Sequence, residues 1–169
     1  MIRILFLGDV VGEPGRKAVI ARLAGLKEEE DIDFIVVNGE NAAGGRGITS
    51  KISIDLLRAG AAVITTGDHV WDQREIVDYF PTEPRLLRPV NYPEGAPGAG
   101  SVVLETPKGK IGVINAQGRV FMTPPLESPL DGVEAVVESM RADGVRVILL
   151  DFHACLLYTS PSPRDATLS

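Results

Sequence analysis

The chain has 169 residues, of which 44% are hydrophobic and 24% charged, a balance typical of one globular domain and not of a disordered chain. Its net charge of −6 excludes the basic surface by which proteins bind long nucleic acids, and no apolar run reaches the ~18 residues of a membrane span. A first strand that begins directly after Met1, and a single cysteine, predict a cytoplasmic protein.

In the first part of the chain, short apolar runs alternate with amphipathic segments. This pattern is typical of strand–helix–strand units that build a largely parallel sheet. In chain order, the expected elements are a strand at 2–7, a helix at 16–27, a strand at 34–37, a helix at 50–59, a strand at 61–65 and a short helix at 72–79. A proline-rich stretch follows at residues 81–97 and predicts an irregular connection.

The next part of the chain begins with a hairpin signal. The Thr-Pro-Lys-Gly turn at residues 106–109 joins expected strands at 101–105 and 110–115. Ser128 is expected to cap a helix through its side chain, with proline and an acid in the first turn. The apolar run at 145–150 then predicts another buried strand.

The segment from residue 155 onward differs from the rest of the chain. Residues 155–169 are rich in serine and proline and have no helical or strand period. They resemble the translation of adapter DNA at the end of a truncated reading frame, so we expect a domain at 1–154 and a non-native tail at 155–169. An ordinary disordered tail is the alternative. Cys155 lies in this segment and is no guide to function.

Polar clusters follow four of the expected strands. They lie at residues 8–9, 38–41, 67–69 and 151–153. Ligands bind at the carboxyl ends of the strands in an open α/β sheet, so these clusters should meet at one rim. The side chains expected there are Asp9, Glu40, Asn41, Asp68, His69 and His153. Carboxylates, amide oxygens and imidazoles suit manganese, iron or zinc, and a cation would offset the repulsion among the carboxylates.

Each cluster also has a simpler structural explanation when it is taken alone. Asp9 can cap a helix, and residues 38–41 can make turn hydrogen bonds. Both histidines of the chain lie beside acids directly after apolar strands, which favours a site over two ordinary core histidines. The glycines near the first strand lack the dinucleotide-binding spacing, and neither a P-loop nor a Gly-x-Ser-x-Gly sequence occurs.

Six sequence blocks resemble the YmdB-like branch of the calcineurin-like metallophosphoesterases. The blocks are residues 8–12 (GDVVG), 38–45 (NGENAAGG), 67–72 (GDHVWD), 88–93 (RPVNYP), 115–122 (NAQGRVFM) and 151–154 (DFHA). Together they extend over essentially all of residues 1–154. The six blocks in the right order are far more specific than any one of them.

The resemblance implies an α/β fold of four layers, with two mixed β-sheets flanked by helices, that is incomplete at the C-terminus. It implies two divalent metal ions, iron or manganese, and His69 as the proton donor. The metal ligands it implies are Asp9, Glu40, Asn41, Asp68 and His153. Asp68 stands where the family usually has asparagine, although aspartate can still bind a hard cation. The family's Gly-Thr-His-Thr-His stretch does not occur in this chain, so the site is expected to be incomplete.

The implied function is metal-dependent hydrolysis of cyclic nucleotides of the 2′,3′ type, with this chain as an inactive N-terminal fragment. The alternative is a regulatory protein that binds a metal or nucleotide without turnover. A third reading is a non-functional fragment with unpaired sheet edges. The expected partner is a small phosphodiester, with no membrane and no long nucleic acid, and homo-oligomerisation stays open.

Overall fold

The structure is a computed structural model that describes residues 1–154. The first part of the chain forms a parallel sheet, which contains, in spatial order, β1 (Ile4–Leu7), β2 (Phe34–Asn38) and β3 (Val63–Thr65). Helix α1 (Gly12–Glu29) connects β1 to β2, and α2 (Ser50–Arg58) connects β2 to β3. Parallel neighbours need such crossovers, because a tight turn can join only antiparallel strands.

The second sheet is mixed. Strands β4 (Ser101–Thr106) and β5 (Gly109–Gln117) form the expected antiparallel hairpin. Helix α4 (Pro129–Ala142) then leads to β6 (Val147–His153), which lies parallel to β5. Between the sheets in sequence lie the short α3 (Ile76–Tyr79) and the single 3₁₀ turn η1 (Phe80–Thr82).

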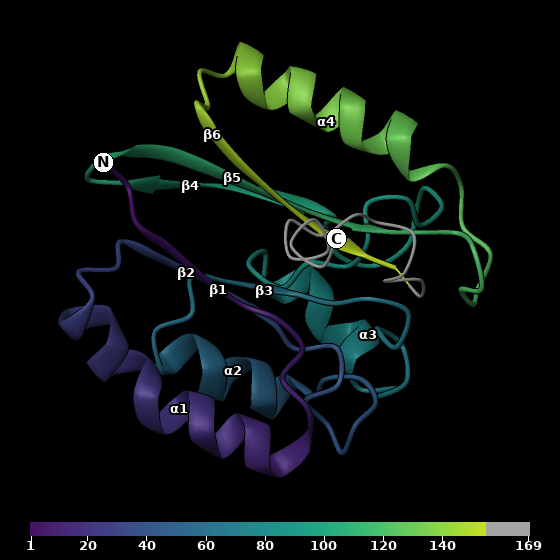
Figure 1. The fold of residues 1–169 in the computed structure, drawn as a ribbon. Coiled ribbons are helices and arrows are strands. Elements are labelled where there is room, and N and C mark those ends of the chain that lie inside the picture. The colour runs from purple at the N-terminus through teal and green to yellow at the C-terminus, as the bar shows by residue number, and fades with distance from the viewer. Residues whose placement is uncertain (155–169) are drawn as a thin grey trace, which may run out of the picture.

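Three apolar clusters separate four layers, so the expected four-layer α/β architecture is confirmed (Figure 1). The side chains of β2 alternate between two of them, as the pleat of a strand requires. Ile35 and Val37 pack toward α1 and α2, whereas Phe34 and Val36 pack between the two sheets. On the outer face of the second sheet, Met140 of α4 packs in the third cluster.

Several element boundaries differ from the sequence-based expectation. Helix α1 begins at Gly12 instead of residue 16, with Glu13 in its first turn. Helix α3 covers only the second half of the expected segment. The Ser128 side chain makes no capping hydrogen bond in the described structure. The sheet of β1, β2 and β3 is parallel and not mixed in residues 1–154, since helices α1 and α2 connect its strands.

Strand β6 differs most from the expectation, and it carries part of the candidate site. It extends to His153 because its pairing with β5 continues to the Gln117–His153 pair. It is also less buried than expected, because β5 is its one strand neighbour among the described residues. Leu150 and Phe152 of β6 are 43% and 46% exposed.

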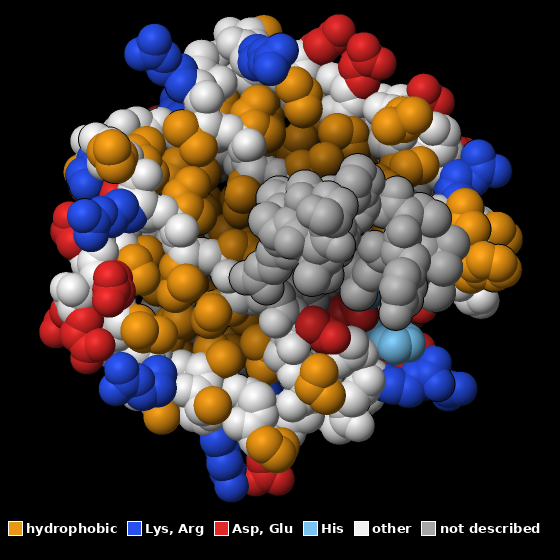
Figure 2. Space-filling model, in the orientation of Figure 1, with side chains coloured by type: hydrophobic (Ala, Val, Ile, Leu, Met, Phe, Trp, Pro, Cys, Tyr) orange, Lys and Arg blue, Asp and Glu red, His pale blue; other side chains and the backbone are white. Residues whose placement is uncertain are grey.

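Hydrophobic side chains gather over much of the face shown in Figure 2. No helix within residues 1–154 is both long and apolar enough to cross a membrane. The expected non-native tail at 155–169, with Cys155, lies outside the described residues.

Candidate metal centre

The expected site residues lie where the strands end. Asp9 follows β1, Glu40 follows β2, Asp68 follows β3, and His153 is the last residue of β6. Backbone hydrogen bonds join the loops: the Val10 amide donates to the Asn38 carbonyl at 3.0 Å. The parallel register of β1, β2 and β3 brings Asp9, Glu40 and Asp68 to one rim. The end of β6, in the second sheet, packs against the same rim, so the four segments meet as the sequence predicts.

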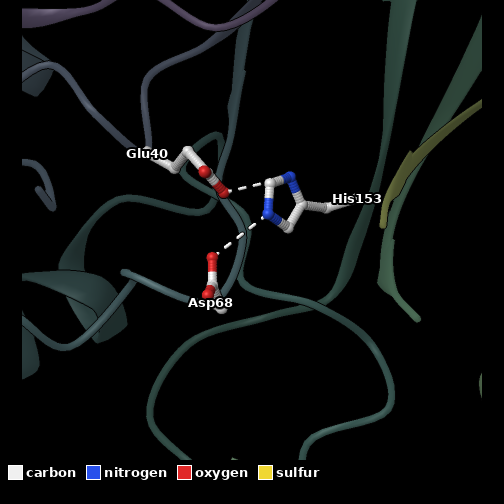
Figure 3. A group of neighbouring side chains, drawn as sticks. All are labelled: Glu40, Asp68 and His153. Carbon is white, nitrogen blue, oxygen red and sulfur yellow. Dashed lines mark hydrogen bonds and ion pairs between the residues drawn. The ribbon is translucent and has the colours of Figure 1, made fainter. Parts of the chain in front are cut away.

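Glu40, Asp68 and His153 form the centre of the cluster (Figure 3). One potential ligand atom of each lies within 4.8 Å of the others. The His153 ring points between the two carboxylates, with Nδ1 3.2 Å from Glu40 Oε2 and Nε2 3.1 Å from Asp68 Oδ1. A side chain of the second sheet thus meets two loops of the first sheet.

Asn41 connects the remaining predicted residues to this centre. Its Nδ2 donates to Asp9 Oδ1 at 2.7 Å and to Glu40 Oε1 at 3.1 Å. Its Oδ1 lies 2.7 Å from His69 Nδ1. All six residues that the sequence singles out therefore belong to one connected cluster.

The electrostatics of the cluster favour a cation. Glu40 is only 2% exposed, and its burial, together with the charges of Asp68 and Asp9, raises the pKa of its carboxyl to about 8. Among the described residues, Glu40 Oε2 has no hydrogen-bond donor, although His153 Nδ1 lies 3.2 Å away. A buried oxygen without a donor is costly. A donor set of carboxylates, an amide oxygen and an imidazole therefore fits a divalent metal ion that would satisfy this oxygen.

Gly67 is a site residue that the sequence reasoning missed. A Cβ atom at this position would overlap Glu40 Oε2 and would lie 2.7 Å from the His153 ring. Only a residue without a side chain lets the two ligand candidates approach each other here. Gly67 adjoins Asp68 and His69 in the sequence, but its steric role depends on a contact with the second sheet.

Asp151 is the second residue whose contacts were not foreseen. Its Oδ2 accepts hydrogen bonds from Asn38 Nδ2 at 2.9 Å and from Thr65 Oγ1 at 2.5 Å. Strand alternation supplies a signal that could have found it, because Asp151 and His153 lie two residues apart on β6 and share a face.

A shallow pocket of about 240 Å³ adjoins the cluster. Its lining residues are Phe6, Gly8, Asp9, Asn38, Asp151, Phe152, His153 and Ala154. This volume lies just below the ~300 Å³ at which small-molecule pockets commonly begin.

Comparison with known proteins identifies the family of this chain. A family profile described as "YmdB-like protein" matches residues 5–158. The chain is 46% identical over 154 residues to a Bacillus subtilis (strain 168) protein named 2′,3′-cyclic-nucleotide 2′-phosphodiesterase, an alignment that covers 90% of this chain and 57% of that protein.

Two solved structures have the same fold. One is a hypothetical protein from Thermus thermophilus, with a TM-score of 0.82 and 34% identity, covering 92% of this chain and 59% of that one. The other is a novel phosphatase from Mycoplasma pneumoniae, with a TM-score of 0.80 and 32% identity, covering 92% of this chain and 56% of that one. The chain thus spans little more than half the length of these relatives. It belongs to the YmdB-like protein family.

Proposed function

We propose that residues 1–154 supply part of the dinuclear metal site of a phosphodiesterase that hydrolyses 2′,3′-cyclic nucleotides. The observation that carries this proposal is the convergence of four strand ends on Glu40, whose buried Oε2 has no donor among the described residues. Family membership and the name of the Bacillus subtilis relative support the substrate class. Iron or manganese suits the mixed oxygen and nitrogen ligands.

The proposed metal ligands are Asp9, Glu40, Asn41, Asp68 and His153. Bound divalent ions would supply Lewis acidity toward a phosphate group and offset the negative charge of the carboxylates. An amide oxygen has two lone pairs, so Asn41 Oδ1 can accept from His69 and still act as a ligand.

His69 is the proposed proton donor to the departing ribose oxygen. Asn41 Nδ2 donates to two carboxylates, so Asn41 presents its oxygen to His69 and His69 Nδ1 carries a hydrogen. This leaves His69 Nε2 for proton transfer. Asp68 Oδ2 lies 4.0 Å from this Nε2 atom.

The 169-residue chain by itself is proposed to bind metal without turnover. It contains two histidines, and both already belong to the cluster described above. The two further histidine ligands of the family motif Gly-Thr-His-Thr-His do not occur in its sequence. A protein that carries this chain together with such a motif would complete the second metal position.

A chimera tests the activity, with residues 1–154 replacing the corresponding part of the Bacillus subtilis relative. In the presence of Mn²⁺, we expect it to hydrolyse 2′,3′-cyclic AMP, and we expect Glu40→Gln and His69→Gln each to lower kcat at least ~100-fold. His69→Gln should keep its Mn²⁺ affinity, whereas Glu40→Gln should not.

The control is Glu138→Gln, which removes an exposed carboxylate of α4. Circular dichroism establishes that each chimera folds. Activity that survives both site substitutions would contradict the proposal. Tight nucleotide binding by a folded, metal-loaded chimera without hydrolysis would favour a binding protein instead.

A further inference from the structure

We propose that Asp151 is a positioning residue that joins the two sheets and sets His153 against Glu40. The inference rests on the proposed metal site, because it explains how two of the ligand candidates are held in register.

The first argument is the placement of the hydrogen bonds of Asp151. Its Oδ2 accepts from Asn38 Nδ2 at 2.9 Å and from Thr65 Oγ1 at 2.5 Å. Asn38 ends β2 and Thr65 ends β3, so both donors belong to the first sheet, whereas Asp151 belongs to the second. The donors are buried, with Asn38 5% and Thr65 0% exposed. One carboxylate oxygen therefore holds β6 to two strands of the opposite sheet.

The second argument is the relation of Asp151 to His153. The two residues are separated by one position on β6, so their side chains leave the same face of the strand. The backbone of His153 is fixed as well, since its carbonyl accepts from the Gly118 amide at 2.7 Å. The distance between β6 and the first sheet at Asp151 therefore determines how far the His153 ring reaches toward Glu40 and Asp68.

The third argument is a second connection, through Asn38. The Asn38 side chain donates to Asp151 through Nδ2 and accepts from the Glu40 backbone amide through Oδ1 at 3.2 Å. Asp151 thus orients the side-chain amide of Asn38, whose oxygen in turn holds the backbone of Glu40. Both Glu40 and His153 depend on the position of this one carboxylate.

The geometry distinguishes this role from metal ligation. The Oδ2 atom of Asp151 is occupied by two donors. Loss of a residue that supports a metal ligand typically weakens metal affinity by about 10–100-fold.

Four substitutions separate a positioning role of Asp151 from metal ligation and from an effect of its charge. Asp151→Ala removes both hydrogen bonds, whereas Asp151→Asn removes the charge and keeps an oxygen that can accept them. Thr65→Val removes one donor. Thr66→Val is the matched control, because the buried Thr66 hydroxyl donates to the Leu87 carbonyl at 2.8 Å and makes no hydrogen bond to Asp151 in the described structure.

The experiment uses the tag-free 169-residue chain and two readouts. Proton NMR of the metal-free chain follows the two imidazoles, with His69→Gln assigning the His153 signals. Titration with Co²⁺, followed by its visible absorption, measures affinity and ligand geometry. We expect Asp151→Ala to move the His153 signals and to weaken Co²⁺ binding by about 10–100-fold, with Thr65→Val intermediate. Asp151→Asn and Thr66→Val should remain close to wild type.

Unchanged His153 signals and Co²⁺ affinity in both Asp151→Ala and Thr65→Val would overturn the proposal. An equal loss in Asp151→Asn and Asp151→Ala would also overturn it, because charge or direct ligation would then explain the effect. If wild type binds no Co²⁺, the proposed function fails, but the metal-free NMR signals still decide whether Asp151 positions His153. If Asp151→Ala does not fold, the His153 signals and the Co²⁺ affinity of Thr65→Val decide whether the proposal holds.

Discussion

At the residue scale, Glu40 combines burial with the proximity of two other carboxylates. Burial disfavours its charged form, and the charges of Asp68 and Asp9 add to this effect. The folded chain therefore binds the Glu40 proton more tightly than the unfolded chain does. A bound cation would reverse this preference by stabilising the carboxylate.

The stability of the metal-free chain should consequently depend on pH through Glu40. Its pKa is raised from 4.5 to about 8 on folding, so stability that is present below pH 4.5 is lost as the pH rises toward 8. We expect Glu40→Gln, which cannot ionise, to remove this part of the pH dependence. With EDTA present, the Tm of wild type should fall more than that of the variant between pH 5 and pH 8. The extra fall should be ~3 °C for each kcal/mol of unfolding free energy that the ionisation of Glu40 removes. Parallel pH profiles would contradict this account.

Gly67→Ala should damage the site by steric overlap alone. The new Cβ would occupy the space of Glu40 Oε2 and approach the His153 ring, so these side chains must separate. We expect the Mn²⁺ affinity to fall at least ~10-fold, the lower end of the effect of disturbing ligand geometry. Gly132→Ala is the matched control. Gly132 lies in helix α4, and its new Cβ would meet the Val90 side chain at an ordinary contact distance of 3.6 Å. Isothermal titration calorimetry measures both, and equal affinities would show that the site tolerates the methyl group.

At the element scale, helix α4 stabilises the second sheet on the face away from the first sheet. Gly112 of β5 permits its close approach, since a Cβ there would lie 2.5 Å from Met140 Sδ. We expect Gly112→Ala to destabilise the chain by about 1–3 kcal/mol, as overpacking does. Urea denaturation measures this loss. The Mn²⁺ affinity of the folded variant should stay at the wild-type value, and a parallel loss of affinity would mean that α4 also controls the site.

The sequence predicts the order of these elements well, because each apolar run corresponds to a strand or to the packed face of a helix. It does not predict where β6 ends. The polar Asp151 interrupts the hydrophobic pattern, whereas the strand continues because β5 offers hydrogen-bond partners as far as Gln117. Hydrophobic periodicity reports burial and carries no information about such pairing.

The residues of the candidate site were predictable for a related reason. Strand-end clusters reveal which side chains meet at a rim, and the structure brings all six together. The contacts of Asp151 with Asn38 and Thr65 join residues 113 and 86 positions apart and depend on how the two sheets pack. The steric role of Gly67 depends on the same packing. No local pattern in the sequence determines how closely the two sheets pack against each other.

At the scale of the whole molecule, metal binding and stability are linked. A ligand that binds only the folded state stabilises it by about 2.7 kcal/mol at 100 times its Kd. We therefore expect saturating Mn²⁺ to raise the Tm of the 169-residue chain by ~5–10 °C, and EDTA to reverse the change. An equal rise in Glu40→Gln would place the stabilising ion elsewhere on this acidic surface.

The central claim is that the strand ends of this chain form a metal site around Glu40, and calorimetric titration with Mn²⁺ tests it most directly. Wild type, Glu40→Gln and the exposed control Glu138→Gln are titrated under the same conditions. The account predicts saturable, EDTA-reversible binding by wild type and Glu138→Gln, and its loss in Glu40→Gln. Absence of binding in the folded wild-type chain, or equal binding by all three proteins, would contradict it.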